Sequence, residues 1–114
     1  MHELSVTESL LEIAIRHGNS AGAKRISHLY LVIGQLSSIV DDSVQFYWDI
    51  VSKDTIAEGA LLHFQRKSIE LSCENCGHQF TPIQSDMTCP SCGSNQVKVI
   101  SGEEFYLEAI DVET

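Results

Sequence analysis

The stretch Cys73-Glu-Asn-Cys76, followed after twelve residues by Cys89-Pro-Ser-Cys92, decides how this chain is organised. Two residues between cysteines allow the backbone to turn back so that both sulfur atoms face one ion. Two such pairs supply four thiolates, the donor set of a closed tetrahedral zinc site. The sequence therefore predicts a zinc ribbon in which Cys73, Cys76, Cys89 and Cys92 hold a structural Zn²⁺.

A glycine follows each pair of cysteines, Gly77 after the first and Gly93 after the second. Because glycine adopts positive φ without steric cost, it lets backbone N–H groups turn toward the sulfur atoms and form a knuckle. Knuckles alone do not choose the metal, so iron in a rubredoxin-like site remains an alternative, as do two disulfides or four buried thiols. A closed site has no open position, so its role is to fold about 30 residues that are too few to bury a stable core.

The composition of the chain argues against several classes of function. Its formal net charge is −9, and its seven Lys and Arg residues are scattered, none of them between Cys73 and Cys92. A nucleic-acid module shows a basic stripe, so we expect no nucleic-acid binding. No apolar run approaches the ~18 residues of a membrane span, and the first residues do not resemble a signal peptide. Free thiols arranged for a metal, without such a signal, indicate a cytoplasmic protein.

Hydrophobic periodicity predicts helices and strands on both sides of the ribbon. The expected helices span residues 4–17 and 42–53, and the expected strands span 24–34, 60–72, 96–100 and 105–113. These elements predict an α+β fold, in which a small three-stranded sheet carries two helices on one face and the zinc ribbon is inserted between strands. The corresponding domains are a nickel-binding α/β domain, residues 1–71 with 98–114, and a zinc-ribbon domain, residues 72–97.

Two local patterns refine this expectation. A polar residue paired with Glu or Gln three positions later predicts each helix start: Ser5 with Glu8, and Asp42 with Gln45. The last strand changes its apolar parity between Leu107 and Ile110, so we expect a bulge near residues 108–109 that restores one buried face.

The N-terminus is a second metal candidate. The large side chain of His2 normally prevents removal of the initiator methionine, so Met1 supplies a free α-amine. That amine, the backbone nitrogen of His2 and its imidazole Nδ1 form five- and six-membered chelate rings, a geometry that Ni(II) and Cu(II) favour with nitrogen donors. Glu3, water or another side chain takes the fourth place, and binding depends on pH because the amine and amide must lose protons. An incompletely closed site suits an ion that is handed on.

The other histidines are weaker metal candidates. His17 lies at the edge of a helix's apolar stripe, and His28 and His63 lie in strands, so we interpret these three as structural. His78 follows Cys76 in the ribbon, where it could couple the two metal sites. No nucleophile with a neighbouring base stands out, and no phosphate-cradling glycine loop occurs, so we expect neither an enzyme nor a nucleotide-binding protein.

Four segments taken together resemble the HypA/HybF family of hydrogenase nickel-incorporation proteins: Met1-His2-Glu3-Leu4-Ser5, Ile33-Gly34, Ala57-Glu58-Gly59 and the paired Cys-x-x-Cys motifs. The resemblance covers essentially the whole chain, in order. It implies a nickel metallochaperone for the maturation of nickel–iron hydrogenase. In this family Ni²⁺ is transferred cargo, bound by the matches of His2 and Glu3, and Zn²⁺ is bound by the matches of the four cysteines.

The resemblance also implies partners. Family members work with a GTPase, HypB, and dock on the hydrogenase large subunit, and some also serve urease. Some members carry a longer ribbon whose histidine joins the nickel site, whereas this ribbon has His78 alone. We expect a monomer or a weak dimer. Two other interpretations stay open, a zinc-ribbon protein–protein adaptor without a nickel role and a dithiol redox protein with labile cysteines.

Overall fold

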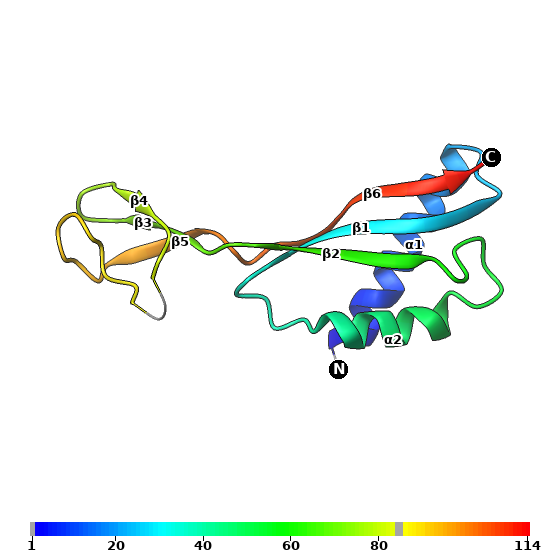
Figure 1. The fold of residues 1–114 in the computed structure, drawn as a ribbon, viewed down its shortest axis with the longest axis horizontal. Helices are drawn as coiled ribbons and strands as arrows, with labels where there is room; N and C mark the ends of the chain where they lie inside the picture. The colour runs from blue at the N-terminus through cyan, green and yellow to red at the C-terminus, as the bar shows by residue number, and fades with distance from the viewer. Residues whose placement is uncertain (1, 84–85) are drawn as a thin grey trace. The chain divides into compact units, whose positions relative to one another are not determined.

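The structure, a computed structural model, describes residues 2–83 and 86–114, and of His2 it describes the backbone alone. In chain order (Figure 1) the elements are α1 (His2–Ser20), β1 (Arg25–Gly34), α2 (Asp41–Val51), β2 (Leu61–Lys67), β3 (Glu70–Cys73), β4 (Gln79–Phe80), β5 (Val97–Ser101) and β6 (Phe105–Glu113). They form an α+β fold, as the sequence predicts.

The chain divides into two compact units. The first comprises Met1–Val32, Ser38–Gln65 and Tyr106–Thr114, and the second comprises Ile33–Ser37 and Arg66–Phe105. The predicted ribbon, residues 72–97, lies inside the second unit, which extends beyond it on both sides and includes a short segment after β1.

The first unit is a three-stranded sheet covered on one face by two helices (Figure 1). The strand order is β2-β1-β6, so β1 is the central strand. In the middle of β1, buried Leu29 and Leu31 alternate with half-buried His28 and Tyr30, which is the period-two pattern that the sequence predicts, whereas residues 31–34 are all buried. The core of this unit is fully or almost fully buried and includes Leu10, Ala14, Ile26, Leu29, Leu31, Val44, Trp48, Ala57 and Leu62.

Helix α1 starts earlier than predicted, at His2, so the proposed capping pair of Ser5 and Glu8 is wrong. Ser5 lies inside the first turns, and the hydroxyl of Thr7 donates to the carbonyl of Glu3, a bond between residues four apart that requires a helix there. Glu3 in the first turn also complements the positive end of the helix dipole.

Helix α2 also begins without its predicted cap. Its N-cap position is Val40, which makes no side-chain capping bond, while Asp41 and Asp42 lie in the first turn. The amide of Gln45 is used elsewhere: Nε2 donates to Oδ1 of Asp49 at 3.0 Å, and Oε1 accepts the N–H of Leu62 at 3.3 Å. This residue therefore ties α2 to β2 and does not cap its own helix.

The predicted strand 60–72 is broken into β2 and β3 by residues Ser68 and Ile69. The break follows from competition by Gln35, whose N–H donates to the carbonyl of Lys67 at 2.8 Å and whose Oε1 accepts the N–H of Ile69 at 3.2 Å. A side chain thus replaces a neighbouring strand at this point, and continuous strand pairing stops.

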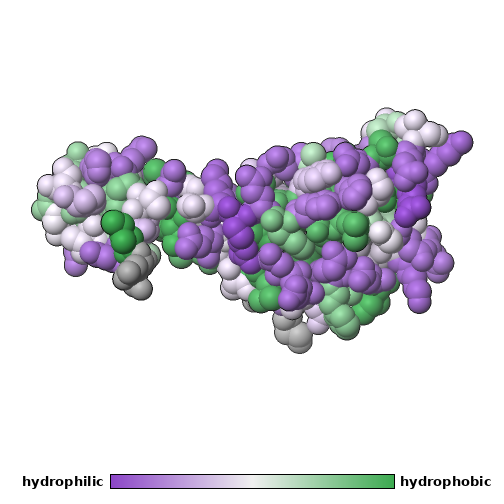
Figure 2. Space-filling model, viewed as in Figure 1, coloured by the Kyte–Doolittle hydropathy of each residue, from purple (hydrophilic) through white to green (hydrophobic). Residues whose placement is uncertain are grey.

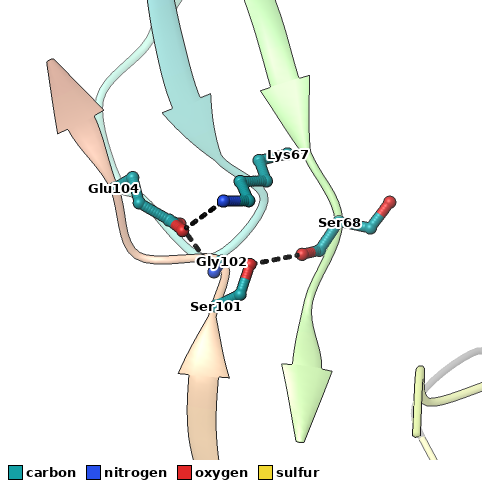
Figure 3. A network of polar contacts seen from close by, with 5 residues as sticks. All are labelled: Lys67, Ser68, Ser101, Gly102 and Glu104. Carbon is teal, nitrogen blue, oxygen red and sulfur yellow. Dashed lines mark hydrogen bonds and ion pairs between the residues drawn. The ribbon is translucent and has the colours of Figure 1, made fainter.

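Figure 3 shows how the carboxylate of Glu104 closes the same region. One oxygen accepts the N–H of Gly102 at 2.6 Å, and the other lies 3.3 Å from Nζ of Lys67. The hydroxyl of Ser101 donates to the carbonyl of Ser68 at 3.3 Å. We call this part of the second unit the collar; it comprises residues 33–37, 67–69 and 101–104.

The rest of the second unit contains a small antiparallel sheet in the order β4-β3-β5. In the pairing of β3 with β5, Cys73 lies opposite Val97, and the register shifts between Glu70 and Leu71. β5 matches the strand predicted to close the ribbon, displaced by one residue.

The last strand, β6, has the predicted bounds. Its half-buried positions are 105 and 107, then 110 and 112, so the parity changes where the sequence indicates. The bulge itself stays a prediction.

Large apolar side chains are exposed on and beside α2, among them Val40, Phe46 and Ile50. Figure 2 shows apolar patches between hydrophilic residues on the visible face of this unit. Over the described residues, neither helix combines the length and hydrophobicity needed to cross a bilayer.

Candidate metal centres

The four cysteines converge as the sequence predicts. Their sulfur atoms all lie within 4.8 Å of one another, with 3.5 Å between Cys73 and Cys92 and 3.7 Å between Cys76 and Cys89. Sulfurs bound tetrahedrally to zinc at ~2.3 Å are about 3.8 Å apart. The cluster therefore has the size that one four-coordinate ion requires.

The sulfur distances also decide against the disulfide alternative. A disulfide bond is about 2.05 Å long, whereas all four cysteines are free thiols in this structure. The donor set fits zinc, and it fits iron equally well, so the choice of metal depends on chemistry beyond the geometry.

Each knuckle directs a backbone N–H at its first cysteine. Asn75 donates to the sulfur of Cys73 at 3.4 Å, and Ser91 donates to the sulfur of Cys89 at 3.4 Å. The donors lie two residues after the cysteine, so the two halves of the site repeat one local structure. N–H groups aimed at sulfur stabilise the thiolate, which is the form that binds a metal.

Gly77 and Gly93 close the two knuckles. Both have positive φ, 78° and 76°, as the sequence predicts. Their own N–H groups do not reach sulfur: they donate to the carbonyl oxygens of Cys73 and Cys89, each at 2.9 Å. The glycines therefore hold the turn, and the residues before them supply the contacts to sulfur.

The thiols of the cluster influence one another's ionisation. The backbone N–H groups of Cys76 and Asn75 lower the pKa of Cys73 to about 6. At Cys92 the N–H of Ser94 works in the same direction, but the neighbouring sulfurs, that of Cys73 foremost, together with partial desolvation outweigh it and raise the pKa to about 12. Four sulfur atoms this close repel one another when all are thiolates. A divalent cation between them offsets that repulsion.

His78 is not part of the cysteine cluster among the described residues. Its carbonyl accepts the N–H of Cys73 at 2.8 Å, and its exposed ring stacks on Phe80 with ring centroids 6.0 Å apart. The backbone of His78 thus helps to shape the first knuckle.

The N-terminal candidates are only partly described. Met1 and the side chain of His2 lie outside the described residues, and the backbone of His2 begins α1. Glu3 is half-buried, and its pKa is lowered chiefly because its own N–H donates to the carboxylate, with a smaller contribution from the N–H of Val40. The start of α2, with Asp41 and Asp42, therefore lies beside the first turn of α1, a neighbourhood that sequence reasoning missed.

Sequence reasoning also missed a pair of histidines. Nδ1 of His28 on β1 and Nε2 of His63 on β2 lie 2.9 Å apart. The alternation in each strand places both rings away from the helices, and that signal was present in the sequence. The pairing of β1 with β2, which brings them together, was not.

Comparison with known proteins agrees with this architecture. The family model described as "Hydrogenase/urease nickel incorporation, metallochaperone, hypA" matches residues 1–112. A protein of Dehalococcoides mccartyi named hydrogenase maturation factor HypA is 45% identical over 113 residues, which cover 99% of this chain and 95% of that protein. The namesake protein of Caldanaerobacter subterraneus is 39% identical over 114 residues, covering 99% of this chain and all of the other.

A solved structure shows the same fold. The solution structure of the Ni metallochaperone HypA from Helicobacter pylori superposes with a TM-score of 0.71 at 25% identity, with 96% of each chain covered. The fold and the cysteine cluster thus define a small α+β protein whose four clustered cysteines could hold one metal ion. The chain belongs to the HypA family of nickel-incorporation proteins, whose members are maturation factors and not enzymes.

Proposed function

We propose that this protein binds Ni²⁺ at its N-terminus and helps to insert it into nickel–iron hydrogenase, while a structural Zn²⁺ occupies the four-cysteine site. The observation that carries the proposal is the family match over residues 1–112, which includes both the N-terminus and the cysteine motifs. The protein acts as a carrier, so Ni²⁺ is its cargo.

The start of α1 supports the nickel ligands. The first N–H groups of an α-helix have no acceptor within the helix, and His2 occupies the first helical position. Its backbone nitrogen is thus not needed by the helix and is available to join the Met1 amine and its own imidazole. Glu3 remains ionised because of its lowered pKa, and its negative charge favours a cation nearby.

The cysteine cluster supports a division of labour between the two metals. Four thiolates around one ion leave no free position, so a metal held there is released slowly and serves the fold. Cargo requires an open site, and the N-terminus supplies one. On this proposal the first unit carries nickel and the ribbon carries zinc.

The resemblance also supports the partners of this proposal, a GTPase resembling HypB and the hydrogenase large subunit. The family match supports a hydrogenase or urease as the recipient of the nickel. On this proposal the protein meets these partners in the cytoplasm as a monomer or weak dimer. Thiols that must stay reduced for the metal fit that compartment.

The decisive test extends the N-terminus by one residue. The extension turns the Met1 amine into a planar amide, a poor donor, so we expect nickel binding to weaken about tenfold or more, ~1.4 kcal/mol. Zinc content and circular dichroism are expected to stay the same. The measurement is a nickel titration followed by absorbance.

A one-residue extension after Thr114 serves as the matched control and should leave nickel affinity unchanged. Equal affinity in the two extended proteins would remove Met1 from the ligand set. It would also favour a role for the ribbon as a protein–protein adaptor.

A further inference from the structure

The open face of the first sheet carries a cluster of rings. His28 and Tyr30 lie on β1 and His63 lies on β2, the neighbouring strand. Leu29, Leu31 and Leu62, which alternate with them, are buried under the helices. Because successive side chains of a strand point to opposite faces, the two histidines lie on the face that no helix covers. His63 is exposed and His28 is half-buried, so both rings are accessible.

The ring nitrogens meet at a distance suited to a metal. Nδ1 of His28 and Nε2 of His63 are 2.9 Å apart, and the ring centroids are 5.0 Å apart. Two imidazole nitrogens bound to one ion at ~2.05 Å, at right angles, are also about 2.9 Å apart. In the metal-free protein the N–H of one ring donates a hydrogen bond to the nitrogen of the other. For an ion to bind there, the donating imidazole moves that proton to its other ring nitrogen, and both accessible rings turn so that their lone pairs converge on the ion.

Tyr30 and Asp111 lie beside the two histidines, and neither is needed as a metal ligand. The ring of Tyr30 stacks on that of His63, with centroids 4.9 Å apart, and limits how far the imidazole can swing. Its hydroxyl donates to the carboxylate of Asp111 at 2.7 Å, and this bond raises the pKa of Tyr30, so the phenol keeps its proton. Asp111 and the net charge of −9 add a negative potential that attracts cations.

We propose that His28 and His63 form a surface site for a divalent transition metal such as Ni²⁺, separate from the cysteine cluster and from the N-terminus. Two imidazoles supply neighbouring positions, and water fills the others. The site is therefore open and exchanges its ion readily. The proposal does not depend on the N-terminal nickel site, which a His2→Ala background removes.

The experiment uses the full, zinc-loaded chain carrying His2→Ala and titrates it with Ni²⁺ alone. Nuclear magnetic resonance of the imidazole nitrogens follows each histidine separately. We expect the signals of His28 and His63 to broaden together and before that of His17. Adding His63→Asn should weaken this binding step at His28 by about tenfold or more.

His17→Asn in the same background is the matched control, because it removes an exposed histidine of α1 that lies outside the pair. It should leave nickel binding at His28 and His63 unchanged. Signals of His28 and His63 that stay sharp at millimolar nickel would overturn the proposal, and so would unchanged affinity at His28 after His63→Asn. Should that variant fold poorly, broadening in the His2→Ala protein decides alone.

Discussion

At the scale of single residues, Gly34 is the glycine of the collar with the least space for a side chain. A Cβ atom built there would overlap the carbonyl of Gly102 and the backbone nitrogen of Glu103, and its own N–H donates to the carbonyl of Glu104 at 2.7 Å. Backbone atoms cannot move aside as a flexible side chain can. Only glycine therefore allows residues 33–37 and 101–104 to pack this closely.

Gly34→Ala should therefore destabilise the second unit by about 2 kcal/mol or more, a loss of stability at least as large as that typical of an overpacked core. Thermal unfolding of the zinc-loaded protein measures the effect. Gly22→Ala is the control, because Gly22 has positive φ but nothing within 4 Å of its Cβ position. A loss no larger at Gly34 than at Gly22 would show that the collar is loosely packed.

Glu104 makes the stability of the collar depend on pH. Its own N–H, that of Gly102 and the Lys67 ammonium lower its pKa from 4.5 to about 2. A carboxyl with a lowered pKa in the folded state stabilises the fold above the unfolded pKa, and this contribution is lost as the pH falls through the folded value. The relevant window thus runs from 4.5 down to about 2.

Glu104→Gln should therefore be less stable than the original protein near neutral pH, and urea denaturation should show the difference shrinking below pH ~4.5. Any metal that the cysteine cluster loses in acid is lost from both proteins, so this effect cancels in the comparison. Glu103→Gln, at the exposed neighbouring position, should show no such trend. A difference independent of pH would mean that the amide replaces the carboxylate fully.

At the scale of elements, α2 is anchored by one large residue. Trp48 is completely buried, whereas Phe46, two positions away, is 61% exposed and packs edge-on against Tyr47. The apolar face of α2 thus enters the core at Trp48 and leaves Phe46 in solvent.

Trp48→Ala should reduce the free energy of unfolding by about 3–5 kcal/mol, the loss typical of a buried aromatic side chain. Phe46→Ala, the matched aromatic on the same helix, should change it by about 0.5 kcal/mol or less. Chemical denaturation of both variants tests the assignment. Similar losses in the two proteins would place Phe46 in a second apolar contact.

The elements also show what can be predicted from the sequence. Apolar alternation located β1 and β6, because a sheet with one covered face imposes a period of two. The ends of helices and the breaks in strands were harder to predict. Ser5 looks like an N-cap, yet α1 already begins at His2. The break after Lys67 depends on Gln35, which lies more than thirty residues away along the chain. Local patterns carry no information about such a partner.

The candidate sites divide in the same way. Cys73 and Cys76 can be recognised from the sequence because their spacing along the chain is that of a metal-binding pair. The second pair of cysteines repeats that spacing. His28 and His63 are 35 positions apart, and only the neighbouring positions of β1 and β2 join them. Sequence reasoning therefore finds sites built within one turn more readily than sites built across strands.

At the scale of the whole molecule, two units with separate cores should respond differently to loss of metal. Cys73→Ser removes one of the four thiolates, so we expect loss of zinc and disorder in the β4-β3-β5 sheet, whose strand β3 ends at that residue. The first unit should keep its core around Trp48. Zinc analysis and amide nuclear magnetic resonance measure both effects.

Ser91→Ala is the control within the ribbon, because it retains the backbone N–H that points at Cys89. It should keep its zinc. Melting of both units in Cys73→Ser would show that they fold as one, and unchanged spectra without zinc would remove the structural role of the metal.

The division of the chain between the units also sets an order of events during synthesis. β6 completes the first sheet beside β1, but it follows the second unit in the chain. A ribosome therefore releases all four cysteines before it releases β6, the second of the two strands that pair with β1. Domains fold as their residues emerge from the ribosome. The nascent ribbon can therefore bind its metal before β6 has joined the sheet of the first unit.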